Sequence, residues 1–272
     1  MSKKRIDLLL VEKGLVESRS LAQRMVMAGQ VRVNDQIVDK PSTQIPEDAN
    51  MTVDTGPPFV SRGGEKLIAA LESFPVKVTG KICADVGAST GGFTDCLLQN
   101  GAAKVYAIDV GYGILHWKLR NDPRVVVMER TNARYVETLP EPVGLVTVDA
   151  SFISLKILLP VIKGWLPPSP PTPLPAGEGR RGEGEVIALV KPQFEAGRKE
   201  AARGEGVIRD PEVHRKVLLE VLAFPQAEGY GIRGLIRSPL EGPKGNVEFL
   251  TWLEYPGEAR DDLEDLVTQV IG

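Results

Sequence analysis

Short apolar runs alternate with segments of helical spacing along most of the chain after residue 60. The runs predict strands at 82–86, 105–110, 125–128, 145–149, 186–190, 232–236 and 247–252, and helical spacing predicts helices at 61–74, 93–98, near 115, and at 155–165, 211–224 and 258–271. This alternation is typical of an α/β fold with a mostly parallel, doubly wound sheet. The last two strands are close in sequence, which favours an antiparallel hairpin at one edge.

The first 54 residues show a different pattern. Apolar residues at helical spacing predict two short helices, the second beginning after Ser18 and ending at Gly29. Residues 31–38 predict a hairpin with a polar turn, and residues 51–53 predict a further short strand. This segment therefore has the pattern of a small α+β unit.

Two segments rich in turn-forming residues interrupt these patterns. The first, at 54–58, places a boundary between a small domain at 1–56 and a larger domain at 57–272. The second, at 167–184, contains six prolines and four glycines and predicts a disordered loop. A proline-rich motif for a partner protein is the alternative interpretation of this second segment.

The composition is that of a soluble protein with a sizeable core, since 42% of the 272 residues are hydrophobic. Without a run of about 18 apolar residues or an apolar segment behind the charged first residues, we expect a cytoplasmic protein that neither spans a membrane nor is secreted. Cys83 and Cys96 lack the spacing of metal ligands, and we expect no metal. The net charge is −3, but residues 1–32 carry seven basic and three acidic side chains, so a local basic patch is predicted.

A glycine-rich loop joins the strand predicted at 82–86 to the following helix. Such a loop lets the backbone approach a nucleotide-like ligand closely. The candidate cofactor-binding residues here are Asp85, Gly87, Ala88, Ser89, Thr90, Gly91, Gly92 and Phe93. Asp109 ends the next strand, where Rossmann-like folds place an acid on a ribose, and Asn132 follows the third strand and is assigned to the adenine. Because Ser89 replaces the middle glycine of the dinucleotide fingerprint, both a dehydrogenase and an enzyme with another adenosine-containing cofactor stay open at this point.

Three further charged residues lie at or near the ends of predicted strands. Asp149 ends the fourth strand, where open α/β sheets hold their ligands, and is therefore also a candidate cofactor-binding residue. Lys191 ends the fifth strand, and Glu248 lies in the last strand between apolar neighbours. Each has a structural alternative: a helix cap for Asp149, a surface lysine for Lys191, and the solvent face of an edge strand for Glu248. Lys66, on the helix at 61–74, could equally decorate the outer face of that helix.

The N-terminal segment resembles the small RNA-binding domain named for a ribosomal protein of the small subunit, also called the αL motif. The resemblance rests on residues 5–7, 18–20, 28–34 and 40–42 and on Val53. In that family, two helices and a hairpin present basic residues to the RNA backbone. The resemblance therefore implies RNA contacts for Arg5, Arg19, Arg24 and Arg32, which would position RNA without reading its sequence.

The four charged residues Lys66, Asp149, Lys191 and Glu248 match in order and context the Lys-Asp-Lys-Glu tetrad of the FtsJ-type RNA ribose 2′-O-methyltransferases. With residues 61–66, 85–94, 148–155 and 189–195, the chain resembles the TlyA family, whose members are rRNA 2′-O-methyltransferases also called haemolysins. This implies a Rossmann-like class I methyltransferase sheet, S-adenosylmethionine as cofactor, and rRNA cytidines or ribosomal subunits as substrate. Arg62, at the lip of the expected pocket, is assigned to a phosphate.

The chemistry is consistent with these residue types. A ribose 2′-hydroxyl is a poor nucleophile, so its methylation needs a base and does not need a metal. A lysine can act as that base where burial and a second ammonium lower its pKa. We therefore expect Lys191 to be the base, Lys66 to be its cationic neighbour, and Asp149 and Glu248 to orient the two amines.

Two alternatives belong to other functional classes. The first is a non-catalytic RNA-binding protein with a methyltransferase-like scaffold, and the presence of all four charged residues counts against it. The second is a membrane-acting haemolysin. The sequence has neither a transmembrane run nor a long basic amphipathic helix to support that activity.

Overall fold

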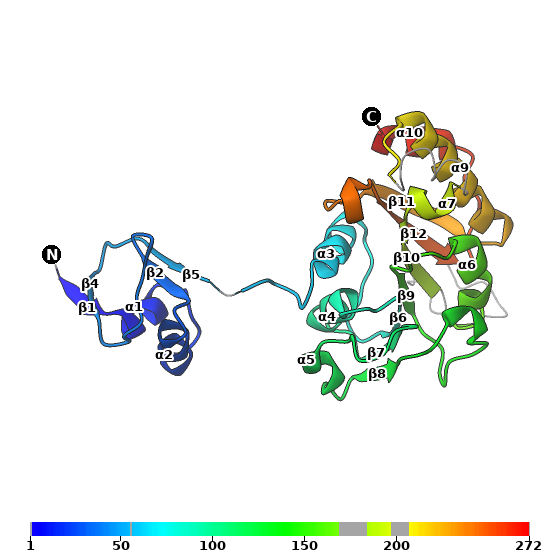
Figure 1. Cartoon of the computed structure of the whole chain (residues 1–272). Coiled ribbons are helices and arrows are strands. Elements are labelled where there is room, and N and C mark those ends of the chain that lie inside the picture. Colours follow the sequence, from blue (N-terminus) through cyan, green and yellow to red (C-terminus); the bar gives the residue numbers. More distant parts are fainter. Residues whose placement is uncertain (1, 55, 169–183, 197–206, 272) are drawn as a thin grey trace, which may run out of the picture. The chain divides into compact units, whose positions relative to one another are not determined.

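A computed structural model describes residues 2–54, 56–168, 184–196 and 207–271 (Figure 1). The chain divides into two compact units between residues 58 and 59. The disordered loop predicted at 167–184 lies outside the described residues except at its ends. At its C-terminal end the prediction is wrong, because Gly184 is the first residue of a strand that pairs with its neighbour from there on.

The smaller unit has two helices and two small sheets. In order, its elements are β1 (Lys3–Arg5), α1 (Ile6–Glu12), α2 (Arg19–Met27), β2 (Val31–Val33), β3 (Gln36–Ile37), β4 (Gln44–Pro46) and β5 (Met51–Val53). The two helices, the hairpin β2–β3 and β5 are confirmed predictions. The short antiparallel pair β1 and β4 was not predicted. Its three-residue strands are too short to show an alternation, and they lie far apart in the sequence of the unit.

The ends of α2 follow the sequence signals. The Ser18 hydroxyl accepts a hydrogen bond from the amide of Leu21, which otherwise has no partner in the first helical turn. Gly29 has φ +70°, the left-handed conformation that ends helices. One face of each helix packs into a core with β2 and β4 that includes Ile6, Leu10 and Val26.

The larger unit is an α/β fold. Its elements are α3 (Gly63–Ser73), β6 (Ile82–Val86), α4 (Gly92–Gln99), β7 (Lys104–Ile108), α5 (Trp117–Arg120), β8 (Val125–Met128), η1 (Ala133–Tyr135), β9 (Leu145–Val148), α6 (Leu155–Lys163), β10 (Gly184–Val190), α7 (Pro192–Glu195), α9 (Pro211–Ala227), β11 (Gly231–Arg237), η2 (Pro243–Gly245), β12 (Phe249–Tyr255) and α10 (Leu263–Ile271). The strands form one seven-stranded sheet in the order β11-β12-β10-β9-β6-β7-β8.

The sheet is parallel from β10 to β8, as the alternation of strands and helices predicted, and β12 pairs with β10 antiparallel. The hairpin β11–β12 is confirmed, with β11 as the edge strand. Its placement was not predicted: β12 lies inside the sheet, paired with β10 on its other side. This arrangement brings the residue before β12 next to the end of β10.

Several strand ends differ from the prediction, and three of these differences affect candidate site residues or their neighbours. β7 ends at Ile108 and β9 at Val148, so Asp109, Val110 and Asp149 lie in the loops that follow. β12 begins at Phe249, so Glu248 precedes the strand. Apolar runs extend past the ladder at these points, whereas a strand continues only as far as its neighbours offer backbone partners.

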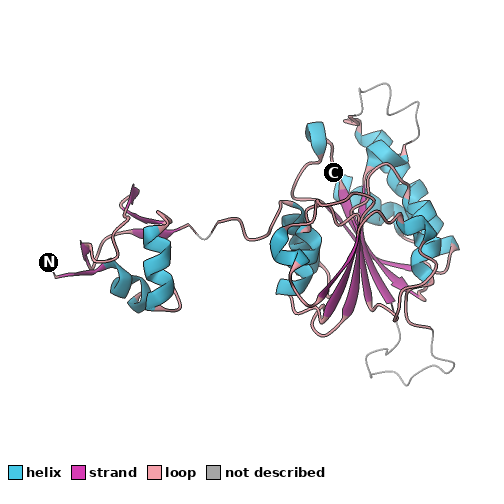
Figure 2. Ribbon diagram, turned by 60° about the horizontal axis from the view of Figure 1, so that its bottom comes forward, coloured by secondary structure: helices cyan, strands magenta, loops and turns pink. Residues whose placement is uncertain are grey.

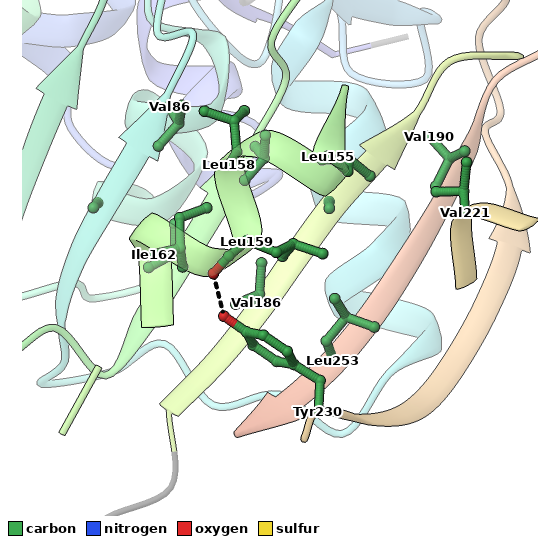
Figure 3. Packing of buried hydrophobic residues seen from close by; sticks show 14 of the residues in the cluster. Val86, Leu155, Leu158, Leu159, Ile162, Val186, Val190, Val221, Tyr230 and Leu253 are labelled. Atoms are coloured by element: carbon green, nitrogen blue, oxygen red, sulfur yellow. Dashed lines mark hydrogen bonds between the residues drawn. The ribbon is translucent and has the colours of Figure 1, made fainter. Parts of the chain in front are cut away.

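Helices cover both faces of the sheet (Figure 2). On one face, α3, α4 and α5 pack over β6, β7 and β10. On the other, α6, α9 and α10 pack over a second core, in which the Tyr230 hydroxyl donates to the Leu159 carbonyl at 2.8 Å (Figure 3). Within the described ranges, every helix is too short or too polar to cross a membrane.

The strand order reverses direction between β6 and β9. In open α/β sheets, ligands bind outside the carboxyl ends of the strands at such a switch point. The loops after β6, β7, β9 and β10 meet at this edge of the sheet.

Candidate active site

The glycine loop after β6 brings the ends of β6 and β9 into contact. Gly87 has φ +82°, and a Cβ atom there would lie 2.7 Å from the carbonyl oxygen of Asp149. Ser89 has φ +50°, and Gly91, with φ +98°, precedes α4. The loop therefore needs glycine at 87 both for its backbone conformation and for the close approach of β9.

Two cavities meet at this loop, one of about 510 Å³ and one of about 310 Å³. Their linings share four residues, namely Gly87, Ser89, Asp149 and Ser151. Their size is in the range of small-molecule sites. Two ligands, or two parts of one reaction, can therefore meet beside the loop.

Five predicted cofactor-binding residues line the smaller cavity, namely Gly87, Ser89, Asp109, Asn132 and Asp149. Asp109 accepts the Ser89 amide on Oδ2 at 2.8 Å and the Gly111 amide on Oδ1 at 2.7 Å. Asn132 lies in the same lining, and its Oδ1 accepts the amide of Arg134. The remaining lining is largely apolar and includes Ile108, Val110, Ala133, Ile153 and Leu158. An apolar slot with a carboxylate at one side has the chemistry of an adenosine site.

Asp85 lies below the loop and lines neither cavity. The side chain is fully buried, and its carboxyl accepts hydrogen bonds from the hydroxyls of Thr94 at 2.7 Å and Thr147 at 3.1 Å. Burial raises the pKa of Asp85 to about 7, an effect that the hydroxyls oppose and that the charge of Asp149 increases. This geometry makes Asp85 a support for the loop.

The other loop residues either line a cavity or pack against a neighbouring side chain. Ala88, Thr90, Gly92 and Phe93 line the larger cavity. Gly91 is in neither lining, and a Cβ atom there would lie 2.2 Å from the side chain of Leu119.

Lys66, Asp149, Lys191 and Glu248 all line the larger cavity, although they come from distant parts of the chain. They form two ion pairs. Lys66 Nζ lies 2.6 Å from Glu248 Oε2, and Lys191 Nζ lies 2.5 Å from Asp149 Oδ1. Lys191 also donates to the Ser151 hydroxyl at 3.1 Å.

These contacts exclude the structural alternatives for two residues. Glu248 is fully buried rather than on a solvent face, and β12 is not an edge strand. The Lys66 side chain is only 12% exposed and points into the cavity, not outward from α3. Burying a carboxylate costs free energy unless a cation and hydrogen bonds compensate, which Lys66 and Gln193 Nε2, at 3.4 Å, do here.

Several residues that shape this site were not predicted from the sequence. Ser151 holds Lys191, and Gly242 packs so closely on Glu248 that a Cβ atom would lie 2.1 Å from Oε1. Phe152 is 89% exposed beside the smaller cavity, has φ +64°, and contacts the ring of Phe194. The one signal in the sequence for Phe152 was an aromatic residue in the loop that follows Asp149.

Glu195 connects two loops of the site. It accepts the Ser154 hydroxyl at 2.6 Å and the Leu155 amide at 2.9 Å, and so caps α6 from the end of α7. Burial raises its pKa. Because α7 begins directly after Lys191, Glu195 fastens the loop of Lys191 to the loop of Asp149.

The predicted RNA-binding residues lie in both units. Arg62 lines the larger cavity. In the smaller unit, Arg24 and Arg32 are exposed, whereas Arg5 and Arg19 bind the buried carboxylate of Asp7. In the parts of the chain that the structure describes, no three side chains of His, Cys, Asp or Glu gather as a metal site would require.

Comparison with known proteins places these features in a family. Residues 59–255 match the family described as FtsJ-like methyltransferase, and residues 4–50 match the S4 domain. The chain is 43% identical over 276 residues to the 16S/23S rRNA (cytidine-2′-O)-methyltransferase TlyA of Mycobacterium tuberculosis, covering 98% of this chain and 97% of that protein.

Two further relatives cover nearly the whole chain. YqxC of Bacillus subtilis is 49% identical over 266 residues, which are 96% of this chain and 89% of that protein. A solved structure of a hemolysin-named protein from Streptococcus thermophilus aligns with TM-score 0.69 at 42% identity, covering 99% of this chain and 96% of the other. The similarity therefore extends over both units and is not limited to the methyltransferase fold.

Proposed function

The chain belongs to the TlyA family, which joins an S4 domain to an FtsJ-like methyltransferase domain, and from this we propose that it methylates the ribose 2′-oxygen of cytidine in rRNA with S-adenosylmethionine as methyl donor. The observation that carries this proposal is the pair of ion pairs, Lys66 with Glu248 and Lys191 with Asp149, in one cavity beside the glycine loop. Two lysines that are largely shielded from solvent and held at a cavity by carboxylates favour an enzyme over a non-catalytic scaffold.

The smaller cavity fits the adenosyl part of the cofactor. Asp109 can accept ribose hydroxyls with its remaining lone pairs, and the apolar lining with Asn132 suits the adenine. Ser89 suits a cofactor without a pyrophosphate, because no phosphate has to approach the loop at that point. When bound, S-adenosylmethionine supplies a methyl group on a positively charged sulfur, which makes that group electrophilic.

The larger cavity supplies the acid–base chemistry. Lys191 in its neutral form accepts the proton of the 2′-hydroxyl at Nζ while the 2′-oxygen takes the methyl group. Asp149 and Ser151 hold Nζ on one side of the cavity. Lys66, held by Glu248, contributes a positive charge to the same cavity, which favours the developing negative charge on the 2′-oxygen.

Substrate nucleotides need positioning as well as chemistry. Phe152 exposes its ring beside Asp149 and Ser151, which suits stacking on an unpaired base, and Arg62 lines the larger cavity, where it can meet a phosphate. Such contacts place the 2′-hydroxyl in attack geometry, and this can lower the barrier more than the base does.

Methyl transfer tests the proposal directly. Purified protein is incubated with tritium-labelled S-adenosylmethionine and with small or large ribosomal subunits, and the RNA is digested to nucleosides for mass spectrometry. We expect 2′-O-methylcytidine. Label on a base, or no label with either subunit or with free rRNA, contradicts the proposal, and calorimetry that found binding of NAD but not of S-adenosylmethionine would contradict the cofactor assignment.

The role of Lys191 has its own test. We expect Lys191→Ala to lower the rate of methyl transfer by about 10² to 10⁴ while cofactor affinity stays nearly constant, because the side chain acts on the 2′-hydroxyl. The matched control is Lys104→Ala, which removes a lysine paired with Glu141 at the amino end of β7 and should transfer at the wild-type rate. A rate for Lys191→Ala near wild type refutes the assignment of the base.

A further inference from the structure

The smaller unit contains a charged cluster around a buried carboxylate, and its residues are in neither cavity lining. Asp7, on α1, is 0% exposed. Arg5 donates to its two oxygens from Nε and Nη2, both at 2.9 Å, and Arg19 Nε donates to Oδ2 at 3.1 Å. Gln23 Nε2 donates to the same Oδ2 at 2.8 Å. We call these four residues the Asp7 cluster.

The cluster fixes the positions of two arginines that stay accessible. Arg5 and Arg19 side chains are 36% and 53% exposed, although the carboxylate between them is buried. Because both donate to Oδ2, their guanidinium groups lie side by side. Within the described ranges, the Nη1 atom of Arg5 and both terminal nitrogens of Arg19 donate to no protein group, so several N–H groups remain for an outside acceptor.

Stability alone does not account for the Asp7 cluster. A buried ion network contributes little compared with apolar side chains of similar size, because removing the charges from water costs about as much as their attraction returns. Lys4, in the same unit, is arranged differently. Its ammonium pairs with two exposed carboxylates, those of Glu12 and Glu47, and their charges offset its attraction for an anionic ligand.

We propose that Asp7 is a positioning residue for RNA: it holds Arg5 and Arg19 as a preformed pair that binds backbone phosphate. An exposed arginine loses side-chain entropy when it orders on a ligand, and a carboxylate that has already ordered it removes part of that cost. Phosphate then accepts charge-assisted hydrogen bonds from two guanidinium groups at once. The inference rests on the proposed function, in which the substrate is rRNA.

The sign of the effect makes the proposal testable. Asp7→Asn removes a negative charge, so charge alone predicts tighter binding to RNA. Positioning predicts the opposite, namely roughly tenfold weaker binding of the full chain to purified ribosomal subunits and a salt dependence whose log–log slope is smaller by about 1 for each phosphate that the variant no longer binds. The matched control is Asp48→Asn, an exposed acid of the same unit, which should bind as tightly as wild type or slightly tighter.

Measurement begins with the wild-type chain and ribosomal subunits. If wild type binds neither subunit, the proposed function fails and this inference with it. If wild type binds and Asp7→Asn binds equally or more tightly with the same slope, or if Asp48→Asn weakens binding as much, only the inference is overturned.

A second variant covers the case in which Asp7→Asn unfolds the smaller unit. Arg5→Lys keeps the charge and replaces the two-bond fork by one ammonium. Thermal unfolding is recorded for each variant. A folded Arg5→Lys chain should bind subunits several-fold more weakly than wild type, and equal affinity overturns the inference.

Discussion

At the scale of single residues, Asp85 shows how burial affects stability through pH. Its carboxyl is enclosed below the glycine loop, and burial raises its pKa from 3.8 to about 7. Between these values the folded chain binds a proton that the unfolded chain has released, so raising the pH favours unfolding. The contribution of Asp85 is therefore fully favourable below about pH 4 and is lost as the pH rises through about 7.

Asp85→Asn should remove this dependence, since an amide does not titrate. We expect the unfolding free energy of Asp85→Asn, relative to that of wild type, to increase by on the order of 4 kcal/mol as the pH rises from about 4 to about 8. Urea denaturation at several pH values measures it. Parallel curves for the two proteins would show that the carboxyl does not titrate in this range.

Gly242 makes a second prediction at this scale. A methyl group at this position would lie 2.1 Å from Glu248 Oε1, so Gly242→Ala must move either the loop or the carboxylate that holds Lys66. We expect at least a tenfold fall in methyl transfer with cofactor affinity nearly constant, because a displacement of about 1 Å in an active site costs on that order. Gly245→Ala, in the same loop, is not a matched control because Gly245 has φ +81°. Gly144→Ala, directly before the amino end of β9, serves instead.

The two variants together test whether the loop of Gly242 fixes the position of Glu248. A fully active Gly242→Ala chain would mean that the loop yields without moving Glu248. Equal losses in Gly242→Ala and Gly144→Ala would point to general destabilisation, which thermal unfolding would reveal.

At the scale of elements, the N-terminus of α6 depends on the short helix α7. Glu195, the last residue of α7, caps the first turn of α6 through Ser154 and the Leu155 amide. Loss of a cap of this kind costs about 1 kcal/mol, and here it also frees the loop that carries Lys191. We expect Glu195→Ala to lower both the melting temperature and the rate of methyl transfer.

Glu195→Gln separates the two effects, because an amide oxygen can still accept one of these hydrogen bonds. We expect its rate to lie between those of wild type and Glu195→Ala. If Glu195→Ala loses stability but transfers methyl groups at the wild-type rate, the connection between α6 and α7 does not position Lys191.

At the scale of the whole molecule, the two units divide the work that we propose. The smaller unit carries Arg24 and Arg32 on its surface, and the larger unit carries both cavities. We expect the double variant Arg24→Glu with Arg32→Glu to bind ribosomal subunits at least tenfold more weakly and to bind S-adenosylmethionine as wild type does. Filter binding and calorimetry measure the two affinities. Unchanged binding to subunits would remove these arginines from the RNA contacts.

Much of this architecture followed from the sequence alone. The order of strands and helices, the end of β6 at the glycine loop, and the parallel core of the sheet depend on local periodicity and on turn residues, which act over a few neighbours. The sequence also grouped Lys66, Asp149, Lys191 and Glu248, because their motifs resemble in order and context a known tetrad, and all four line the larger cavity.

Tertiary structure decided what each of these residues touches. Lys66 and Glu248 are 182 positions apart, and their pairing depends on β12 lying inside the sheet next to β10. The buried carboxyl of Asp85 likewise has a distant partner, since the Thr147 hydroxyl, 62 positions along the chain, donates to it. Local pattern sets which elements form, whereas contacts between distant elements depend on how their faces pack, and no short window of sequence contains that information.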